Sequence, residues 1–461
     1  MARQQPNDRL VALLGEAEWK GTELARAVVT LGAAQGLRLG YDRTSVAHWL
    51  SGSRPRPPVP ELVAAALTRR IGRAVTPEDT GLVPTRRATA AFTELRPRAT
   101  DSDARDVVHR MIDLCRQDAD PTNRAHLKRS IFSPTGLAVP AWPSTSDQLR
   151  TPIDPGAEVT SAPAELLQEM GRLFLDLAVR YGGAHARTSL VIYLADDVAS
   201  ILAAPAPPHA HRELLTTASQ LTHILADMTI DAGHPGLAQR YYTIALALAR
   251  QADDRRQYAI TLRSISLQSL TLGHPTTAHR FAHAALEAAG PSIDPAARAF
   301  LLAQHALTQA HQHHSRSARA TLIDAEYWHE QADSNPSGPF TNYPRPGLEY
   351  QRAQTLSALG DWPGALASLS DAARNRNSTQ RTPHALTQAR LAETHLRLGH
   401  LEVACHHWHI FLNVYPRIRS HRADRAHIRL LHAAGRFPHQ RHATALLEHA
   451  QTVITRSPEN P

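Results

Sequence analysis

The chain has 461 residues, of which 42% are hydrophobic and only 5% are aromatic, and its formal net charge is +8. It has no run of about 18 apolar residues, which excludes a membrane-spanning helix. The two cysteines, Cys115 and Cys405, are too few for a disulfide framework. Because Met1–Arg9 is polar and lacks the apolar core of a signal peptide, we expect a cytoplasmic protein.

The first predicted domain, residues 1–82, is a compact helical module. Its expected helices are Leu10–Leu14, about Thr22 to Val29, Asp42 to Leu50, and Pro60–Ile71. Asp42 is a favourable N-cap for the third helix, and Gly52 is a favourable residue just beyond its end.

The run Thr44–Pro57, TSVAHWLSGSRPRP, resembles the recognition helix and exit turn of the xenobiotic-response-element (XRE) class of helix-turn-helix repressors. Leu24 and Ala25 resemble part of the second helix of that class. The segment Leu31–Tyr41 is longer than the tight turn of the class. We expect it either to lengthen the second helix or to widen the turn.

The third helix is predicted to enter a major groove of DNA. Its base-reading residues would be Arg43, Thr44, Ser45 and His48, which precede or surround the expected buried positions Val46 and Trp49. Arg54 and Arg56 follow the helix and would grip the sugar-phosphate backbone. Residues 1–96 hold 14 Lys/Arg against nine Asp/Glu, so the positive charge is concentrated at this end.

Residues 83–160 are predicted to connect two domains. One amphipathic helix is expected at Arg105–Gln117, followed by a proline-rich linker from Pro134 to Pro155.

Residues 161–458 are predicted to form an array of helix pairs, because small residues recur there at a nearly fixed period. The anchors are Gly233/Ala238/Ala245, Gly273/Ala278/Ala285, His313/Ala318/Ala325, Gly360/Ala365/Ala372 and Gly399/Ala404/Phe411. The Gly or His positions are 40, 40, 47 and 39 residues apart, and the proline-rich segment Ser334–Pro346 explains the long spacing. Each Gly would end a first helix in a left-handed conformation. A looser unit follows Gly435, and a pair around Gly182 and Gly183 precedes the clear repeats.

This pattern resembles the tetratricopeptide (TPR) family, with a period longer than is usual there. The first helices carry the expected small residue at Ala226, Ser266, Ala306, Ala353 and Ala392. The resemblance implies an all-α fold, a helix-turn-helix module followed by an α-solenoid whose first helices line a concave groove. The groove positions carried over are Gln220, His223, Asp227, Asp231, Arg263, Leu267, Phe300, Leu307, His311, Tyr350, Gln354, Glu393 and Arg397.

No catalytic or metal-binding pattern stands out, so we expect a protein that is not an enzyme and has no cofactor. The chain contains no Gly-Lys pair and therefore no P-loop. The run Cys405–His409 contains three histidines, but successive residues of a helix point in different directions, and zinc needs converging ligands. For His311, His313 and His314 we expect a solvated turn.

A DNA-reading module fused to such an array resembles the helix-turn-helix/TPR regulators of bacteria. The resemblance implies a one-component transcriptional regulator whose array senses a peptide, a small ligand or a partner protein. A homodimer on a palindromic operator is the expected form. The alternative is a cytosolic TPR scaffold whose N-terminal module docks proteins and does not bind DNA.

Overall fold

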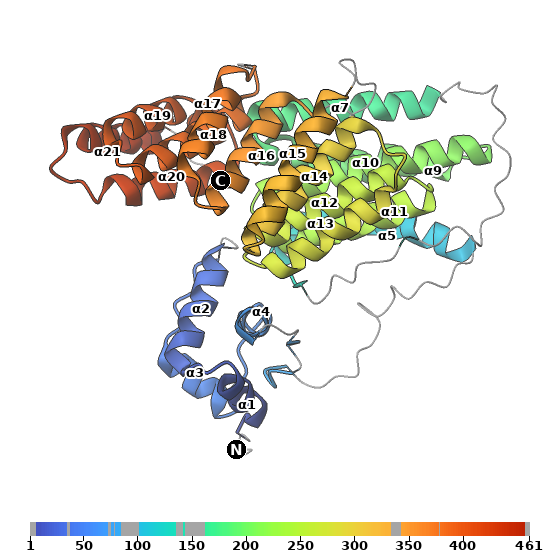
Figure 1. Ribbon diagram of the computed structural model, residues 1–461. Coiled ribbons are helices and arrows are strands. Elements are labelled where there is room, and N and C mark those ends of the chain that lie inside the picture. Colours follow the sequence, from blue (N-terminus) through green and yellow to red (C-terminus); the bar gives the residue numbers. More distant parts are fainter. Residues whose placement is uncertain are drawn as a thin grey trace.

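The computed structural model describes residues 6–34, 37–71, 75–77, 79–83, 101–134, 142, 162–332, 343–377 and 379–456. Across these ranges every regular element is helical, which confirms the all-α prediction. Figure 1 shows a small N-terminal module beside a larger array of helices. Most of the predicted Pro134–Pro155 linker, and much of Ser334–Pro346, lies outside the described residues.

The N-terminal module has four helices, namely α1 (Asp8–Glu16), α2 (Gly21–Ala34), α3 (Arg43–Leu50) and α4 (Val59–Ile71). One hydrophobic cluster holds them together and extends from Leu10 to Leu82. The side-chain amide of Asn7 donates to the Thr80 carbonyl at 2.9 Å, and its backbone N–H donates to the Leu50 carbonyl at 2.9 Å. These bonds tie the two ends of the module to α3.

The long segment between the second and third helices has both of the predicted effects. Helix α2 continues to Ala34, and residues 37–42 are not helical. Leu37 and Leu39 pack against the core of the module, and Tyr41 meets Trp49 edge-on at 5.3 Å between ring centroids. The connection is therefore held in place by apolar contacts.

The larger part of the chain is an array of antiparallel helix pairs (Figure 1). Its elements are α7 (Ala162–Tyr181), α8 (Gly183–Tyr193), the π-helical turn η2 (Leu194–Val198), α9 (Ala199–Ala203), α10 (Pro208–Asp231), α11 (Pro235–Gln251), α12 (Arg255–Thr271), α13 (Pro275–Ala289), α14 (Pro295–His311), α15 (Ser315–Glu330), α16 (Arg345–Ala358), α17 (Trp362–Arg374), α18 (Arg381–Arg397), α19 (Leu401–Val414), the 3-10 turn η3 (Tyr415–Arg417), α20 (His421–Ala434) and α21 (Arg441–Arg456). The pairs α10/α11 to α18/α19 correspond to the five predicted repeats. The sixth pair, α20/α21, is the looser unit.

The turn inside each clear repeat has a left-handed residue at the predicted anchor. The φ angles are 86° at Gly233, 84° at Gly273, 62° at His313, 81° at Gly360 and 85° at Gly399. Gly435 is different, with a φ of −60°. The period in the sequence thus reports a repeated backbone turn, which the sixth unit does not share.

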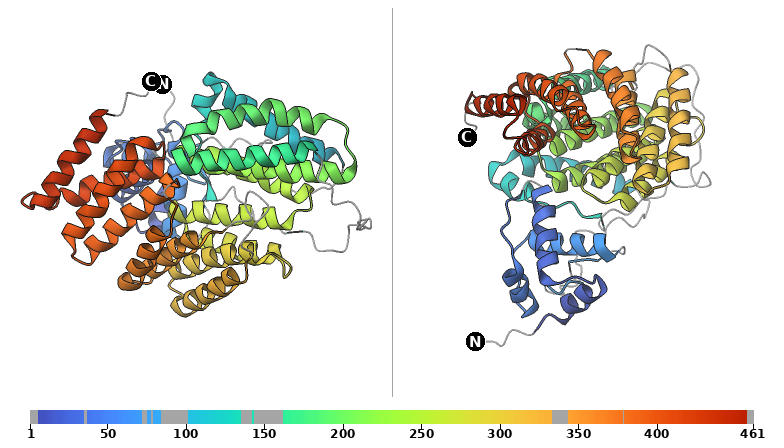
Figure 2. Two further views of the ribbon diagram at one scale, coloured as in Figure 1. Left: turned by 90° about the horizontal axis from the view of Figure 1, so that it is seen from above. Right: turned by 60° about the vertical axis from the view of Figure 1, so that its left-hand side comes forward.

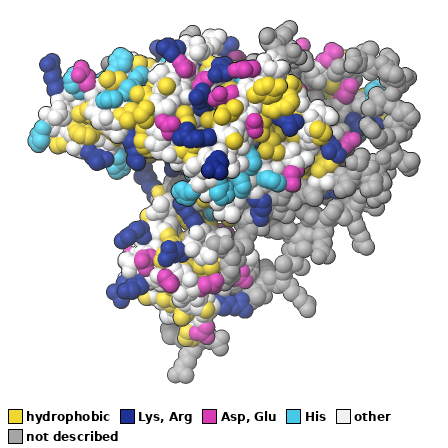
Figure 3. Space-filling view, viewed as in Figure 1, with side chains coloured by type: hydrophobic (Ala, Val, Ile, Leu, Met, Phe, Trp, Pro, Cys, Tyr) yellow, Lys and Arg dark blue, Asp and Glu magenta, His cyan; other side chains and the backbone are white. Residues whose placement is uncertain are grey.

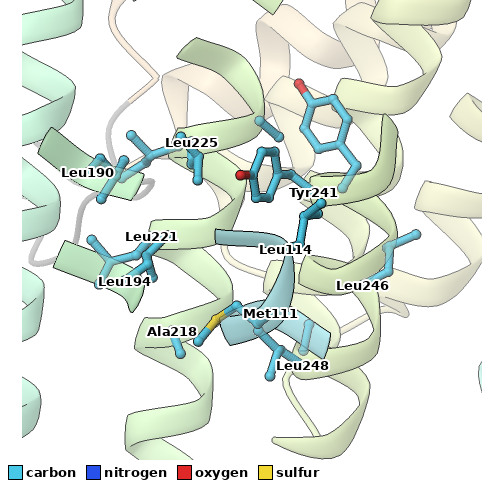
Figure 4. Packing of buried hydrophobic residues seen from close by; sticks show 14 of the residues in the cluster. Met111, Leu114, Leu190, Leu194, Ala218, Leu221, Leu225, Tyr241, Leu246 and Leu248 are labelled. Atoms are coloured by element: carbon cyan, nitrogen blue, oxygen red, sulfur yellow. The ribbon is translucent and has the colours of Figure 1, made fainter. Parts of the chain in front are cut away.

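Helix α5 (Asp101–Ala119) belongs to the core of the array although it precedes the repeats in sequence. Figure 4 shows Met111 and Leu114 of α5 lying among residues of α10 and α11, including Leu221 and Leu248. The short helix α6 (Pro121–Leu127) follows it. An amphipathic helix was predicted here, but its burial in the array was not.

The segment 130–134, which we call the strap, joins the module to the array. Ile131 packs against the core of the module, whereas Phe132 is buried in the core of the array and lies beside His274. The Ser133 backbone N–H donates to the Gln239 side chain at 2.8 Å, and the Gln239 amide donates back to the Ser133 carbonyl at 2.9 Å. Neighbouring residues of one segment therefore anchor both bodies.

The array curves back on itself, so that α18 packs against α7 and the start of α20 reaches α10, while α21 lies apart from the first helices in the views of Figure 2. The Arg419 backbone N–H donates to the Tyr181 carbonyl at 2.7 Å, and the Ala184 N–H donates to the Arg419 carbonyl at 3.2 Å. A Cβ at Gly182, whose φ is 87°, would lie 2.2 Å from the Arg419 carbonyl oxygen. We call the meeting of residues 181–184 and Asp231 with residues 419–422 the closing contact.

Candidate nucleic-acid interface and inner surface of the array

Helix α3 buries one face and exposes the other. Val46 and Trp49 are buried in the module core, while Arg43, Thr44 and His48 are exposed. Val46 and Trp49 are three residues apart and share the buried face, whereas Thr44 and His48 are four apart and share the exposed face; Arg43 begins the helix. The exposed side chains could reach an extended partner along α3.

Ser45 has a local structural role in α3. The Asp42 carboxylate accepts the Ser45 backbone N–H at 2.9 Å and the Ser45 hydroxyl at 2.8 Å, which forms the N-terminal cap of the helix. The backbone and side-chain hydrogen bonds from Ser45 lower the pKa of Asp42. Ser45 is therefore engaged in capping and is only partly exposed, unlike the other predicted base-reading residues.

Arg54 and Arg56 are both exposed in the segment after α3. The chain turns at Gly52, where φ is 100°, and leaves the helix at that point. Two guanidinium groups thus follow the exposed face of α3. They are suitably placed for contacts to a phosphate backbone, which position a protein without reading sequence.

The first helices of the pairs (α10, α12, α14, α16, α18 and α20) form what we call the inner surface. Successive members such as α12 and α14, or α14 and α16, pack on one another, and α20 returns to α10 through the closing contact. The predicted groove residues divide by exposure into the exposed Asp227, His311 and Arg397, the half-buried Gln220, Leu267, Phe300, Tyr350, Gln354 and Glu393, and the buried His223, Asp231, Arg263 and Leu307. The four buried residues support the array and do not offer free surface.

Asp231 is the centre of the closing contact. Its carboxylate accepts from the Gly183 N–H at 2.8 Å, the Ser420 hydroxyl at 2.6 Å and Nε of Arg422 at 2.8 Å. Burial by itself would raise the pKa of Asp231, but the Arg422 charge and these hydrogen bonds lower it overall. The carboxylate joins residues about 190 positions apart in the chain. No sequence pattern marks Ser420 or Arg422 for this contact; the pair Gly182–Gly183 is the one local sign of a close approach between segments.

Arg263 is held by uncharged groups. It donates to the Gln351 side chain at 2.8 Å and lies over the Phe300 ring at 3.8 Å from the centroid. Phe300 in turn meets Tyr343 edge-on at 4.9 Å. These contacts bring together α12, α14 and α16, so two predicted groove residues, Arg263 and Phe300, do lie side by side.

Other inner residues are also paired. His223 lies 2.9 Å from the Thr261 hydroxyl, and Tyr242 donates to Asp227. Glu393 accepts from Nε of Arg429 on α20 at 2.7 Å. The inner surface consequently carries both charge signs, and most of its groups already have partners within the array.

Arg397 lies at the edge of the inner surface, over the Trp362 ring at 4.5 Å. This contact joins α18 to the start of α17. The guanidinium is therefore partly engaged although the residue is exposed.

Several histidines of the array lie in pairs and small groups. His279 and His305 stack at 5.1 Å between centroids, and burial, followed by the neighbouring His279 and His283, lowers the pKa of His305 to about 4. Figure 3 shows histidines gathered along the side of the array nearest the module. In the run Cys405–His409, Cys405 is buried and His407 bonds Gln388 at 2.7 Å. Within the described ranges, no group of three or more His, Cys, Asp or Glu could hold a metal ion.

The comparison with protein families concerns the N-terminal module. A family model described as the SP15 N-terminal domain matches residues 10–83, which include α2, α3 and α4 entirely. No curated protein matches the chain. Of the helices that the structure describes, none combines the length and the apolar character needed to cross a membrane. The chain is thus similar, over its first module, to the SP15 N-terminal domain.

Proposed function

We propose that the protein is a cytoplasmic, DNA-binding transcriptional regulator of the XRE helix-turn-helix type, with a TPR-like array that senses a peptide, a small ligand or a partner protein. The observation that carries the proposal is the division of α3 into a buried face, with Val46 and Trp49, and an exposed face, with Arg43, Thr44 and His48. A recognition helix requires this arrangement, because its base-reading side chains must leave the core of the module.

The surroundings of α3 support the same reading. Arg54 and Arg56 add two exposed positive charges directly after the helix, where phosphate contacts would fix its register. Helix α2 packs across α3, as the first helix of a helix-turn-helix does. One module offers a small interface, so we propose a homodimer on a palindromic operator.

The array supports a sensing role through its curvature and its strap. A ligand on the inner surface could bind one curvature more tightly than another, and only such a difference can shift a conformational equilibrium. Because the strap anchors the module and the array through adjacent residues, Ile131 and Phe132, a change in the array would act on the position of the module that carries α3.

The direct test is capture of genomic DNA fragments by the purified full-length chain, followed by measurement of affinity against salt concentration. We expect a sequence-specific site and a steep log-log slope, near −5 if about six phosphates are contacted. Absence of any DNA shift at physiological salt, together with capture of a protein partner, would favour the alternative of a cytosolic scaffold.

Two arginine variants separate the roles of the residues. Arg43→Ala should cost roughly 1–3 kcal/mol of binding free energy and relax preference at one base position. Arg54→Ala should weaken binding to all sequences alike and reduce the salt slope by about one. Arg316→Ala is the matched control, because Arg316 is exposed on α15 of the array. If the Arg43 and Arg54 variants behave like the control, α3 does not read DNA.

A further inference from the structure

A cleft of about 480 Å³ lies between α2 and α4 of the N-terminal module, apart from both the exposed face of α3 and the inner surface of the array. Its apolar lining comes from Trp19, Ala27, Leu31 and Ala66. Figure 1 shows α2 and α4 beside each other where the module approaches the array. The volume falls in the range of small-molecule sites, about 300–1,000 Å³.

Three guanidinium groups also line this cleft, those of Arg26, Arg69 and Arg70. The single acidic lining residue, Glu23, already accepts the Lys20 backbone N–H at 2.6 Å. In the part of the chain that the structure describes, none of the three arginines forms an ion pair; Arg70 donates from Nε to the Ala17 carbonyl at 2.9 Å. The cleft therefore combines an apolar wall with an excess of positive charge, for which the described residues supply no ion pair.

One of these arginines also contacts the array. The Arg69 guanidinium lies so close to Gly273, in the turn between α12 and α13, that a Cβ there would be 2.6 Å from Nη1. The neighbouring His274 packs against Phe132 of the strap. A ligand that draws Arg69 into the cleft would thus act on the joint between module and array.

We propose that the α2–α4 cleft binds a small organic anion, with a flat apolar body against Trp19 and Leu31 and a carboxylate, sulfonate or phosphate group held by Arg26, Arg69 and Arg70. Arginine suits this task because its planar fork pairs with two oxygens of one anionic group and also stacks on aromatic surfaces. Trp19 offers a broad rigid face for the body of the ligand. The site is distinct from the inner surface, so the array could sense one molecule and this cleft another.

The test uses the full-length chain and two fluorescent probes that differ by one charged group. 1-Anilinonaphthalene-8-sulfonate carries a sulfonate, and N-phenyl-1-naphthylamine is its neutral counterpart. We expect the sulfonate probe to occupy a site that the double variant Arg26→Gln/Arg69→Gln weakens at least tenfold. The neutral probe should bind the unaltered chain and the double variant alike.

Further measurements test the charge class of the ligand and whether the variants are folded. Arg316→Gln, on the array, should leave binding of the sulfonate probe unchanged, and the circular dichroism spectra of all variants should match that of the unaltered chain, which shows that each is folded. Displacement of the probe by inorganic phosphate but not acetate would assign a phosphate ligand, and the reverse would assign a carboxylate. Equal sulfonate binding by the double variant and the unaltered chain would overturn the proposal, as would equally tight binding of the neutral probe. Neither result bears on whether α3 reads DNA.

Discussion

Helix α3 of the N-terminal module and the inner surface of the array differ in where their polar side chains point. On α3, Arg43, Thr44 and His48 project away from a small apolar core. On the inner surface of the array, residues such as Asp231 and Arg263 bond to neighbouring helices. The exposed face of α3 thus presents polar side chains to the outside, whereas many polar side chains of the array hold the fold together.

A polar residue on the expected face of a helix is therefore a weak guide to function when the helix has neighbours on that face. Helix α3 lies at the edge of a four-helix module and keeps its face open. The inner helices curve towards one another, so their polar groups become partners. Burial of unpaired charges is costly, and this cost favours such pairing.

The largest effect should come from breaking the polar contact that fixes α5 in the array. Asp118 is fully buried, binds the Arg187 guanidinium and accepts the Tyr241 hydroxyl at 2.6 Å. Asp118→Ala should lower the free energy of unfolding by about 3–5 kcal/mol, because it leaves a buried arginine without its partner. Urea denaturation measures this, with the exposed Asp113→Ala on the same helix as control. Equal effects of the two variants would show that the buried pair is dispensable.

The joint between module and array should be sensitive to acid through His274. Burial, followed by the Arg69 charge, lowers the pKa of this histidine from 6.5 to about 4. A histidine that is neutral when folded stabilises the protein fully above pH 6.5, and this contribution is lost as the pH falls towards 4. The loss amounts to about 3 kcal/mol.

Urea denaturation at pH 7 and pH 4.5 compares the unaltered chain with His274→Gln, which cannot gain a proton. We expect the variant to lose less stability between the two pH values. An identical loss would mean that other groups account for the acid sensitivity.

The closing contact should make a smaller contribution, because Arg422 keeps about half of its surface exposed, 54%. Asp231→Ala should cost about 2 kcal/mol, mainly by leaving the Gly183 N–H and the Ser420 hydroxyl without their acceptor. Small-angle X-ray scattering should also report a more open array. Asp324→Ala, exposed on α15, is the control; a variant as compact and stable as this control would disprove the role of the contact.

The smallest expected effect separates two neighbouring residues of α3, the capping Ser45 and the exposed Thr44. Ser45→Ala should lower the stability of the module by about 0.5 kcal/mol and leave DNA preference unchanged, because the hydroxyl serves the helix cap. Thr44→Ala, at the exposed neighbouring position, should leave the stability of the module unchanged and alter the base preference of DNA binding. Thermal unfolding and DNA titration of both variants test this pair. A change of base preference in Ser45→Ala would show that Ser45 contacts a base and does not act only in the helix cap.

Much of the fold could be predicted because its signals are local. The left-handed anchors at Gly233, Gly273 and Gly399 recur at the expected period, and the Asp42 cap begins α3 where it was predicted. Groove positions were harder to predict, because exposure of residues such as Asp231 depends on helices distant in sequence.

The all-α class, the helix pairs of the array and the two faces of α3 follow from local sequence signals, since turns, caps and apolar periodicity act over a few residues. The strap, the closing contact, the α2–α4 cleft and the burial of α5 depend on contacts between distant segments. These features join segments as far apart as Asp231 and Ser420, 189 positions along the chain, and no local preference encodes which of them meet. The contact between Asp231 and Ser420 depends on the summed curvature of the stacked helices, and that curvature becomes defined only when the whole array has formed.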